Sequence, residues 1–200
     1  MKLYYVPGAC SLAPHIVASE AGLKISLNKV AFGEKRTTED GRDFHSISPQ
    51  GAVPTLELDD GSVLTENAVL LQYLAAQAPQ AGLAPQDGMA RWRLLETLNF
   101  IATELHKSFS PLFRNPSPEA REAQVKLILG RFELLAGKLG DKPYLTGDAF
   151  SIADAYAYVM LAWANMFKLD LPEKLQTYFV RMRARPGVQQ ALKEEGLPTG

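Results

Sequence analysis

Cys10 is the first candidate for chemistry, and it is the only cysteine in the sequence. It follows a strand-like run, Leu3–Val6, and a Pro-Gly turn, and a helical pattern begins directly after it. The positive end of a helix favours a thiolate over a thiol. No second cysteine follows at the spacing of a redox dithiol motif. Cys10 is therefore a candidate nucleophile or thiolate contact, and a buried structural cysteine is the alternative.

Val53-Pro54 is the second candidate, because a proline that starts a strand loses no ladder hydrogen bond. If this peptide bond is cis, the backbone N–H and C=O of Val53 turn outward and can pair with an extended peptide ligand. An ordinary trans proline at the start of the strand is the alternative.

Thr65-Glu66-Asn67 forms a third candidate, where the next helix begins. Exposed amides at a helix start can hold a carboxylate, and Glu66 can accept from an ammonium group. A ligand with an α-amino acid end carries both groups. The alternative is that Thr65 or Asn67 only caps the helix.

Asn99, Thr103 and His106 are spaced four and three residues apart, so we expect them to share one face of a long helix. Phe109 and Phe113 continue this face, which suits a ligand with one polar and one apolar end. A solvated or hydrogen-bonded surface histidine is the alternative for His106. His15 and His45 stand alone, and we assign no role to them.

Composition excludes several classes of function. The 200 residues are 46% hydrophobic and 22% charged, which is typical of a globular protein. A net charge of -1 gives no electrostatic case for nucleic acid or a membrane surface. The sequence has neither a signal-peptide pattern nor an apolar run of the roughly 20 residues that span a bilayer. We expect a cytoplasmic protein, and the absence of a Cys/His/acid cluster predicts no metal.

The first 77 residues alternate between strand and helix patterns. We expect strands at 3–6, 25–31, 53–58 and 62–64, with helices at 11–21 and from about 67, and at most a short helix within 33–48. This order, β-α-β-α-β-β-α, implies parallel pairing through crossovers, followed by an antiparallel hairpin. The first domain is predicted to be a small α/β domain over residues 1–80.

A segment rich in proline and glycine, 78–88, predicts a linker, and strand signals nearly vanish beyond it. An apolar stripe from Leu94 to Leu112 predicts one long helix. Ser117-Pro118-Glu119 opens another, and Ser151-Ile-Ala-Asp154 resembles a capping box ahead of a further one. Shorter helices flank Arg185-Pro-Gly187. Residues 88–200 are therefore predicted to form an all-α domain.

In this order the motifs resemble the glutathione transferases, specifically the bacterial beta type, over essentially the whole chain. The segments that carry the resemblance are Tyr5–Ser11, Gln50–Pro54, Leu64–Asn67, Asn99–Lys107 and Ser151–Ala155. The resemblance implies a thioredoxin-like domain that binds glutathione, and a helical-bundle domain that supplies a hydrophobic pocket. It also implies a homodimer that acts in detoxification.

The resemblance also implies roles for individual residues. Cys10 would contact the glutathione sulfur, Val53 would pair with the cysteinyl backbone before a cis Pro54, and Lys35 would meet the glycyl carboxylate. Glu66 and Asn67 match positions at the γ-glutamyl end, although many relatives have Ser or Gly where Asn67 stands. The positions matched near glutathione on the long helix are Asn99, Thr103, Glu104 and His106. His106 would lie close to the sulfur and the electrophile, and Ser151 and Asp154 match a cap that is critical for folding.

Three functions remain open from the sequence. The first is conjugation of the glutathione thiolate to a hydrophobic electrophile, with Cys10 and His106 as catalytic residues. Four aromatic residues would wall its apolar pocket: Phe109, Phe113, Trp163 and Phe167. The second is thiol transfer or reductive dehalogenation through a mixed disulfide at Cys10. The third is a non-catalytic carrier of hydrophobic molecules.

Overall fold

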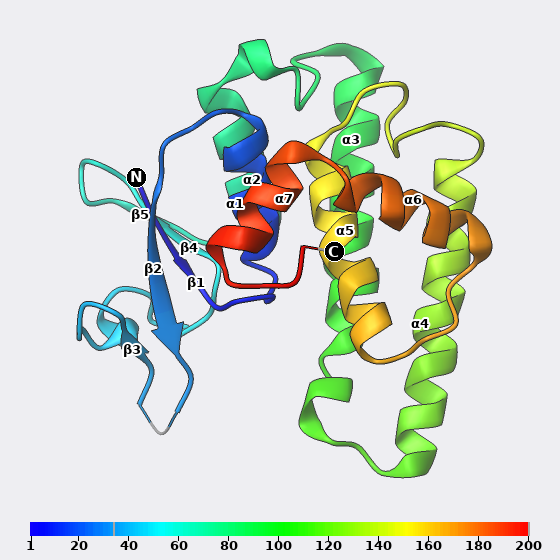
Figure 1. Ribbon diagram of the computed structural model, residues 1–200, viewed down its shortest axis with the longest axis horizontal. Helices are drawn as coiled ribbons and strands as arrows, with labels where there is room; N and C mark the ends of the chain where they lie inside the picture. Colours follow the sequence, from blue (N-terminus) through cyan, green and yellow to red (C-terminus); the bar gives the residue numbers. More distant parts are fainter. Residues whose placement is uncertain (34, 200) are drawn as a thin grey trace. The chain divides into compact units, whose positions relative to one another are not determined.

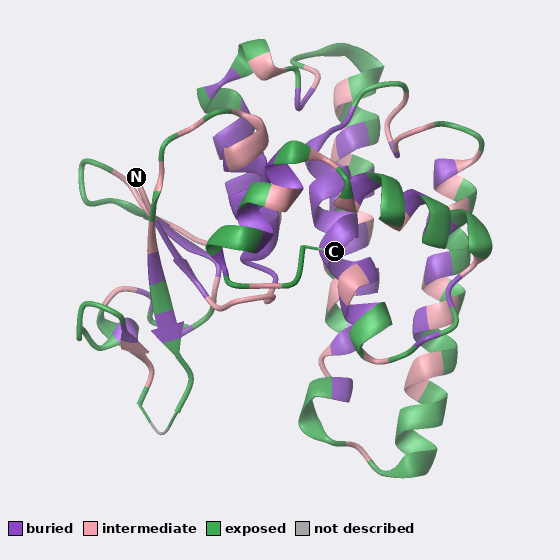
Figure 2. Cartoon of the chain, viewed as in Figure 1, coloured by how far each residue is buried: buried purple, intermediate pink, exposed green. Residues whose placement is uncertain are grey.

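In a computed structural model of the protein, the structure is described for residues 1–33 and 35–199. It divides into two compact units, Met1–Leu83 with Ala184–Gly200, and Ala84–Arg183. Figure 1 traces the elements of both, and Figure 2 marks their buried residues. The division differs from the predicted one, because residues 184–200 group with the first unit rather than with the helices that precede them.

The first unit is built on a sheet whose five strands lie in the order β3-β2-β1-β4-β5. These strands are β1 (Lys2–Tyr5), β2 (Ser26–Ala31), β3 (Thr37–Thr38), β4 (Thr55–Glu57) and β5 (Val63–Leu64). β1 pairs in parallel with β2, and the crossover between them is α1 (Leu12–Glu20). β4 runs antiparallel to both β1 and β5, and α2 (Asn67–Gln77) follows this hairpin.

The described residues between β2 and β4 include the short strand β3 and a 3-10 turn, Phe44–Ser46. This turn stands where the predicted order had its second helix. Phe44 is fully buried against Tyr4 and Val30, so the turn packs onto the sheet through this aromatic ring. The predicted class, an α/β domain of the thioredoxin-like type followed by a helical domain, is confirmed.

α7 (Pro186–Glu194) packs against α1, as Figure 1 shows. The approach is close, since a Cβ added at Gly187 would lie 2.6 Å from the Glu20 Cγ. Arg185 reaches both carboxylate oxygens of Glu20, at 3.0 and 2.6 Å. This close contact and the ion pair explain why the last helix belongs with the α/β unit.

The second unit is helical, with α3 (Gly88–Phe100), α4 (Pro118–Leu139), α5 (Ile152–Met166) and α6 (Glu173–Arg183). The prediction of one long helix over residues 94–112 is only partly right. After Phe100 the chain changes to a π-helical segment, Ile101–His106, and then to a 3-10 turn, Lys107–Phe109. Such π segments are rare and occur frequently at functional sites.

The start of α5 is a capping box, as predicted from Ser151 and Asp154. Asp154 is fully buried and accepts from the backbone of Leu145 and Ser151, the Ser151 hydroxyl and the Tyr178 hydroxyl, all within 2.6–2.8 Å. Burial raises the pKa of this carboxyl, and the four donors oppose the rise. One side chain thus joins α5, α6 and the loop between α4 and α5.

In the described part of the chain, no helix combines the length and the apolar character needed to cross a bilayer.

Candidate functional site

Cys10 lies in the turn directly before α1, nearly buried, and its thiol is 3.2 Å from the backbone carbonyl of Val53. The Val53–Pro54 peptide bond is cis. The structure therefore brings together two of the sequence candidates, which are 43 residues apart.

The turn that carries Cys10 is fixed from two directions. The Ser11 hydroxyl bonds both the N–H and the C=O of Val6, at 3.1 and 3.2 Å. From the start of α2, the Asn67 side-chain nitrogen donates to the Cys10 carbonyl at 3.0 Å. Asn67 therefore does not cap its own helix through this group, and holds the Cys10 turn instead.

The start of α2 also carries two features that suit a ligand. The Oδ1 atom of Asn67 is buried and has no hydrogen-bond partner. Glu66, at the N-cap position, makes no side-chain cap and is exposed, and its backbone has φ +67° and ψ 112°. A non-glycine residue with this backbone costs about 1–3 kcal/mol, and such residues cluster at ligand-binding sites.

Lys35 lines a surface cavity of about 330 Å³ in the first unit, together with Arg36, Thr37, Gly41, Asp43 and His45. Gly51 lies close by with φ +59°, and a Cβ added there would come within 2.7 Å of the Arg36 guanidinium and would also overlap the His45 ring. The two basic side chains Lys35 and Arg36 make the cavity suitable for a carboxylate.

Asn99 and Thr103 are exposed, and the Thr103 hydroxyl donates to the Asn99 carbonyl at 3.0 Å. Glu104, in the π-helical segment, pairs with Arg131 of α4 at 2.8 Å. His106 is directed differently, because its Nδ1 lies 2.7 Å from the hydroxyl of the buried Tyr156. The predicted common face thus holds for Asn99 and Thr103, while His106 turns toward α5.

Burial, followed by the positive charge of neighbouring Lys107, lowers the pKa of His106 to about 4. The imidazole is therefore neutral near pH 7. The Trp163 ring lies edge-on to it, with centroids 5.1 Å apart. A neutral histidine fixed through Nδ1 can offer its Nε2 side as a hydrogen-bonding group.

The four predicted pocket aromatics contact one another in the second unit. Trp163 and Phe167 both meet Phe113, at centroid distances of 4.9 and 5.0 Å. Phe113 is 49% exposed, whereas Phe109 is 0% exposed and stacks on Phe167 from the core side. Phe113 is thus the member available to a ligand, and Phe109 supports it from beneath.

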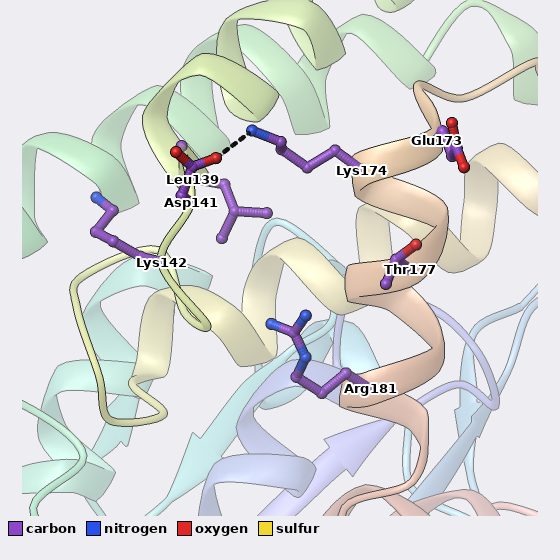
Figure 3. A pocket seen from close by; sticks show the side chains of 8 residues that line it. Leu139, Asp141, Lys142, Glu173, Lys174, Thr177 and Arg181 are labelled. Atoms are coloured by element: carbon purple, nitrogen blue, oxygen red, sulfur yellow. Dashed lines mark hydrogen bonds and ion pairs between the residues drawn. The ribbon is translucent and has the colours of Figure 1, made fainter.

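A larger cavity of about 410 Å³ lies elsewhere on the second unit, between the end of α4 and α6 (Figure 3). Lys174 and Asp141 form an ion pair of 3.1 Å across it. The residues that line it include none of the predicted site residues.

Sequence reasoning missed several residues of the candidate site. Arg36, Arg131 and Tyr156 contact or adjoin predicted residues, but no motif marked them. His45, to which no role was assigned, lines the Lys35 cavity. The partners of Arg131 and Tyr156 lie on other elements, so local spacing carried no signal for these two residues.

The fold and these motifs define a class. Residues 8–77 match the glutathione S-transferase N-terminal domain, and residues 100–186 match the glutathione S-transferase C-terminal domain. The chain belongs to the glutathione S-transferase family.

Individual relatives refine this assignment. The chain is 44% identical to glutathione S-transferase GstA of Escherichia coli O157:H7, an alignment that covers 98% of this chain and 100% of that one. Among solved structures, a sphingomonad glutathione S-transferase complexed with glutathione matches with a TM-score of 0.93 and 43% identity. The bacterial beta class glutathione S-transferase of Sphingomonas chungbukensis matches with a TM-score of 0.91 and 43% identity. Both comparisons cover 99% of this chain and 100% of the other, and the resemblance to the bacterial beta class is confirmed.

Proposed function

We propose that this member of the family transfers the thiolate of glutathione to an electrophilic carbon of a small hydrophobic compound, with Cys10 as the contact for the glutathione sulfur. The observation that carries the proposal is the convergence of Cys10, Val53 and Asn67 in one unit. The thiol contacts the Val53 carbonyl, and the Cys10 backbone is bonded to the start of α2. A ligand sulfur beside the thiol therefore lies next to groups that suit a peptide.

The residues of the first unit fit glutathione at both ends. At the start of α2, the unpartnered Oδ1 of Asn67 and the exposed Glu66 carboxylate are acceptors for an ammonium group. Lys35 and Arg36 are donors for a carboxylate. Val53, before the cis Pro54, is proposed to pair with the cysteinyl backbone. Since Asn67 already holds the Cys10 carbonyl, its role combines positioning and binding.

The second unit is proposed to supply further contacts to glutathione as well as the electrophile pocket. We assign Asn99, Thr103 and Glu104 to glutathione, and Phe113 with Trp163 and Phe167 to the apolar wall, supported by Phe109. His106 is proposed to act as a neutral hydrogen-bond donor, because its lowered pKa leaves no charge near pH 7. Catalysis then comes from positioning and from donors that favour the thiolate.

The test is a Cys10→Ala variant assayed with glutathione and an aryl halide. The proposal predicts a lower rate of conjugation and weaker ionisation of the bound glutathione thiol, followed by its ultraviolet absorbance across pH. A variant that retains both the rate and the ionisation of the wild-type protein would remove Cys10 from this role.

A second candidate function uses Cys10 as a nucleophile, and its position in the turn just before α1 favours it, because the positive end of a helix favours a thiolate. The Cys10 thiolate attacks the glutathione sulfur of a mixed disulfide, and the other thiol leaves. A second glutathione thiolate then attacks the Cys10–glutathione bond, which releases glutathione disulfide and restores the thiolate. Intact-mass detection of a Cys10 adduct that turns over favours this route over conjugation. Ligand binding without turnover of any electrophile would favour a carrier.

We further propose a homodimer that acts in detoxification in the cytoplasm. Leu127 and Leu134 of α4 are 46% and 52% exposed, and their spacing places them on one helix face with Arg131, the partner of Glu104. Such an apolar face is suited to a two-fold contact. Light scattering of the purified protein measures the mass directly, and a monomeric mass at micromolar concentration would contradict the dimer.

A further inference from the structure

His45 lies in the 3-10 turn Phe44–Ser46 and lines the Lys35 cavity. Its side chain is exposed to solvent, yet the ring is held in place. Nδ1 lies 3.3 Å from the backbone carbonyl of Pro49, and a Cβ added at Gly51 would lie 2.4 Å from Cε1 of the ring. The His45 ring therefore takes the space that a side chain at Gly51 would fill.

Arg36 is brought to the same glycine by backbone pairing. Its carbonyl accepts from the N–H of Phe44 at 2.9 Å, so the residue before β3 is tied to the turn that carries His45. The guanidinium carbon lies 4.7 Å from the centroid of the Phe32 ring, and one guanidinium nitrogen would be 2.7 Å from a Cβ at Gly51. Stacking on an aromatic face leaves the N–H edge of a guanidinium able to bind a carboxylate. The cavity thus carries nitrogen groups from two segments, both placed against Gly51.

Gly51 connects this cavity with the segment that is proposed to pair with glutathione. It lies two positions before Val53, which precedes the cis Pro54. In glutathione the glycyl carboxylate lies one residue beyond the cysteinyl backbone, and an extended residue spans about 3.3–3.6 Å. A cysteinyl backbone paired with Val53 therefore brings the carboxylate within reach of the groups around Gly51.

The Pro49 contact decides which protonation state of His45 can bind a carboxylate. A carbonyl only accepts, so Nδ1 carries the hydrogen of this contact, and Nε2 is a bare acceptor in the neutral ring. Nε2 can donate to a carboxylate only in the imidazolium form. In the described part of the chain, the other charged residues that line the cavity are Lys35, Arg36 and Asp43. Asp43 caps the turn, because its Oδ1 accepts from the His45 N–H at 3.0 Å.

We propose that His45 is a further binding residue for the glycyl carboxylate of glutathione, and that its ring takes up a proton from solvent when this carboxylate binds. The ligand then meets an imidazolium beside Lys35 and Arg36, and the contribution of the carboxylate to affinity grows as the pH falls toward about 6. The inference deepens the proposed function and rests on it. It gives a role to a histidine to which the sequence assigned none.

The experiment compares glutathione with glutathione amide, whose glycyl carboxylate is replaced by a carboxamide of the same shape. The two ligands share the thiol and the γ-glutamyl end, so the ratio of their dissociation constants isolates the carboxylate. Calorimetry of the wild-type protein is expected to show a preference for glutathione that grows several-fold from about pH 8 to about pH 6. His45→Phe keeps a ring to pack on Gly51 but removes both nitrogens. It should lower the preference about fivefold near pH 6 and make it independent of pH.

Two further variants separate the imidazole from general effects of charge. His45→Gln keeps a neutral donor, so it should retain part of the preference and lose its pH dependence; it replaces His45→Phe if that variant does not fold. Lys24→Met removes one positive charge from the first unit at an exposed position that does not line the cavity, and should behave as the wild-type protein does. Denaturant unfolding shows that each variant is folded.

The proposal is overturned if the preference of a folded His45→Phe or His45→Gln protein depends on pH as that of the wild-type protein does. An equal loss of preference in Lys24→Met, or a wild-type preference that is the same at both ends of the pH range, also overturns it. A wild-type protein that binds glutathione and glutathione amide equally well contradicts the carboxylate contact while leaving the proposed function intact. One that binds neither ligand contradicts the proposed function itself.

Discussion

The side-chain amide of Asn67 donates a hydrogen bond of 3.0 Å to the backbone carbonyl of Cys10. The first residue of α2 thereby fixes Cys10, which lies in the turn just before α1, so the starts of two helices are joined through the Cys10 backbone. The same amide leaves its oxygen buried and without a partner. An unpaired buried acceptor is costly, so its persistence favours a ligand donor at this position.

Asn67→Ala is the direct test of this relationship. It leaves the Cys10 carbonyl without its donor, and we expect the free energy of unfolding to fall by about 1–3 kcal/mol. We also expect a several-fold rise in KM for glutathione. Denaturant unfolding and steady-state kinetics measure the two effects. Val69→Ala, at an exposed position of the same helix, serves as the control. If Asn67→Ala behaves like this control in both assays, the contact has no such role.

Glu66 allows binding to be separated from folding. Its backbone has φ +67°, which costs about 1–3 kcal/mol in a residue with a Cβ. Glycine adopts this conformation freely but loses about 1 kcal/mol more in chain entropy. Glu66→Gly should therefore fold with equal or higher stability and yet bind glutathione more weakly.

Glu66→Gln completes this test, since it keeps the backbone and removes only the charge. It should weaken glutathione binding, measured by calorimetry, without changing the unfolding midpoint. A Glu66→Gly protein that is clearly less stable but binds normally would show that this backbone has no connection with the ligand.

The sequence predicted those parts of the site that are local. Cys10 before a helix, a proline at a strand start and a polar triplet at a helix start are each visible within a few residues. Their convergence was supplied by the family resemblance, because no spacing rule connects Cys10 with Val53. Glu195 directly follows α7, its side chain is buried, and it lies outside the segments that carry the family resemblance. Its partners are Gly8 and His15, and only the docking of α7 on α1 brings them together.

The direction of His106 was also beyond the sequence. Regular helical spacing placed it on a face with Asn99 and Thr103, but the π-helical segment Ile101–His106 changes the phase of the helix. A propensity for π-helix is not readable from spacing, since it depends on how the segment packs against its neighbours. Burial beside Tyr156 and Trp163 then sets both the orientation and the pKa of the ring.

The lowered pKa of His106 predicts a specific dependence of stability on pH. The folded protein keeps this imidazole neutral down to about pH 4, while the unfolded chain binds a proton near the ordinary value of 6.5. The contribution of the neutral His106 to the free energy of unfolding is therefore complete above pH 6.5, and it is lost as the pH falls toward 4. Between pH 7 and about pH 5, the free energy of unfolding of His106→Gln should fall by about 1–2 kcal/mol less than that of the wild-type protein.

Denaturant unfolding at a series of pH values measures this difference. Val69→Ala, which removes no titratable group at an exposed position, is the control and should run parallel to the wild-type curve. Parallel curves for His106→Gln and wild type would mean that the folded protein binds a proton at His106 as readily as the unfolded chain does.

Asp154 is the residue whose replacement we expect to destabilise the protein most. Its carboxylate receives four hydrogen bonds that join α5, α6 and the loop before α5, and it lies in the core of the second unit. Asp154→Ala leaves these donors buried without an acceptor, so we expect a loss of about 3–5 kcal/mol in the free energy of unfolding. Asp154→Asn keeps one acceptor oxygen and should cost less. Tyr178→Phe removes one donor only, and should cost about 1 kcal/mol.

The control is Asp148→Ala, which replaces an exposed aspartate in the same loop. The order expected from chemical denaturation is therefore Asp154→Ala, Asp154→Asn, Tyr178→Phe, Asp148→Ala, from the least to the most stable. If Asp154→Ala were as stable as Asp148→Ala, the network would contribute nothing to folding, and the cap at the start of α5 would be a local feature of that helix alone.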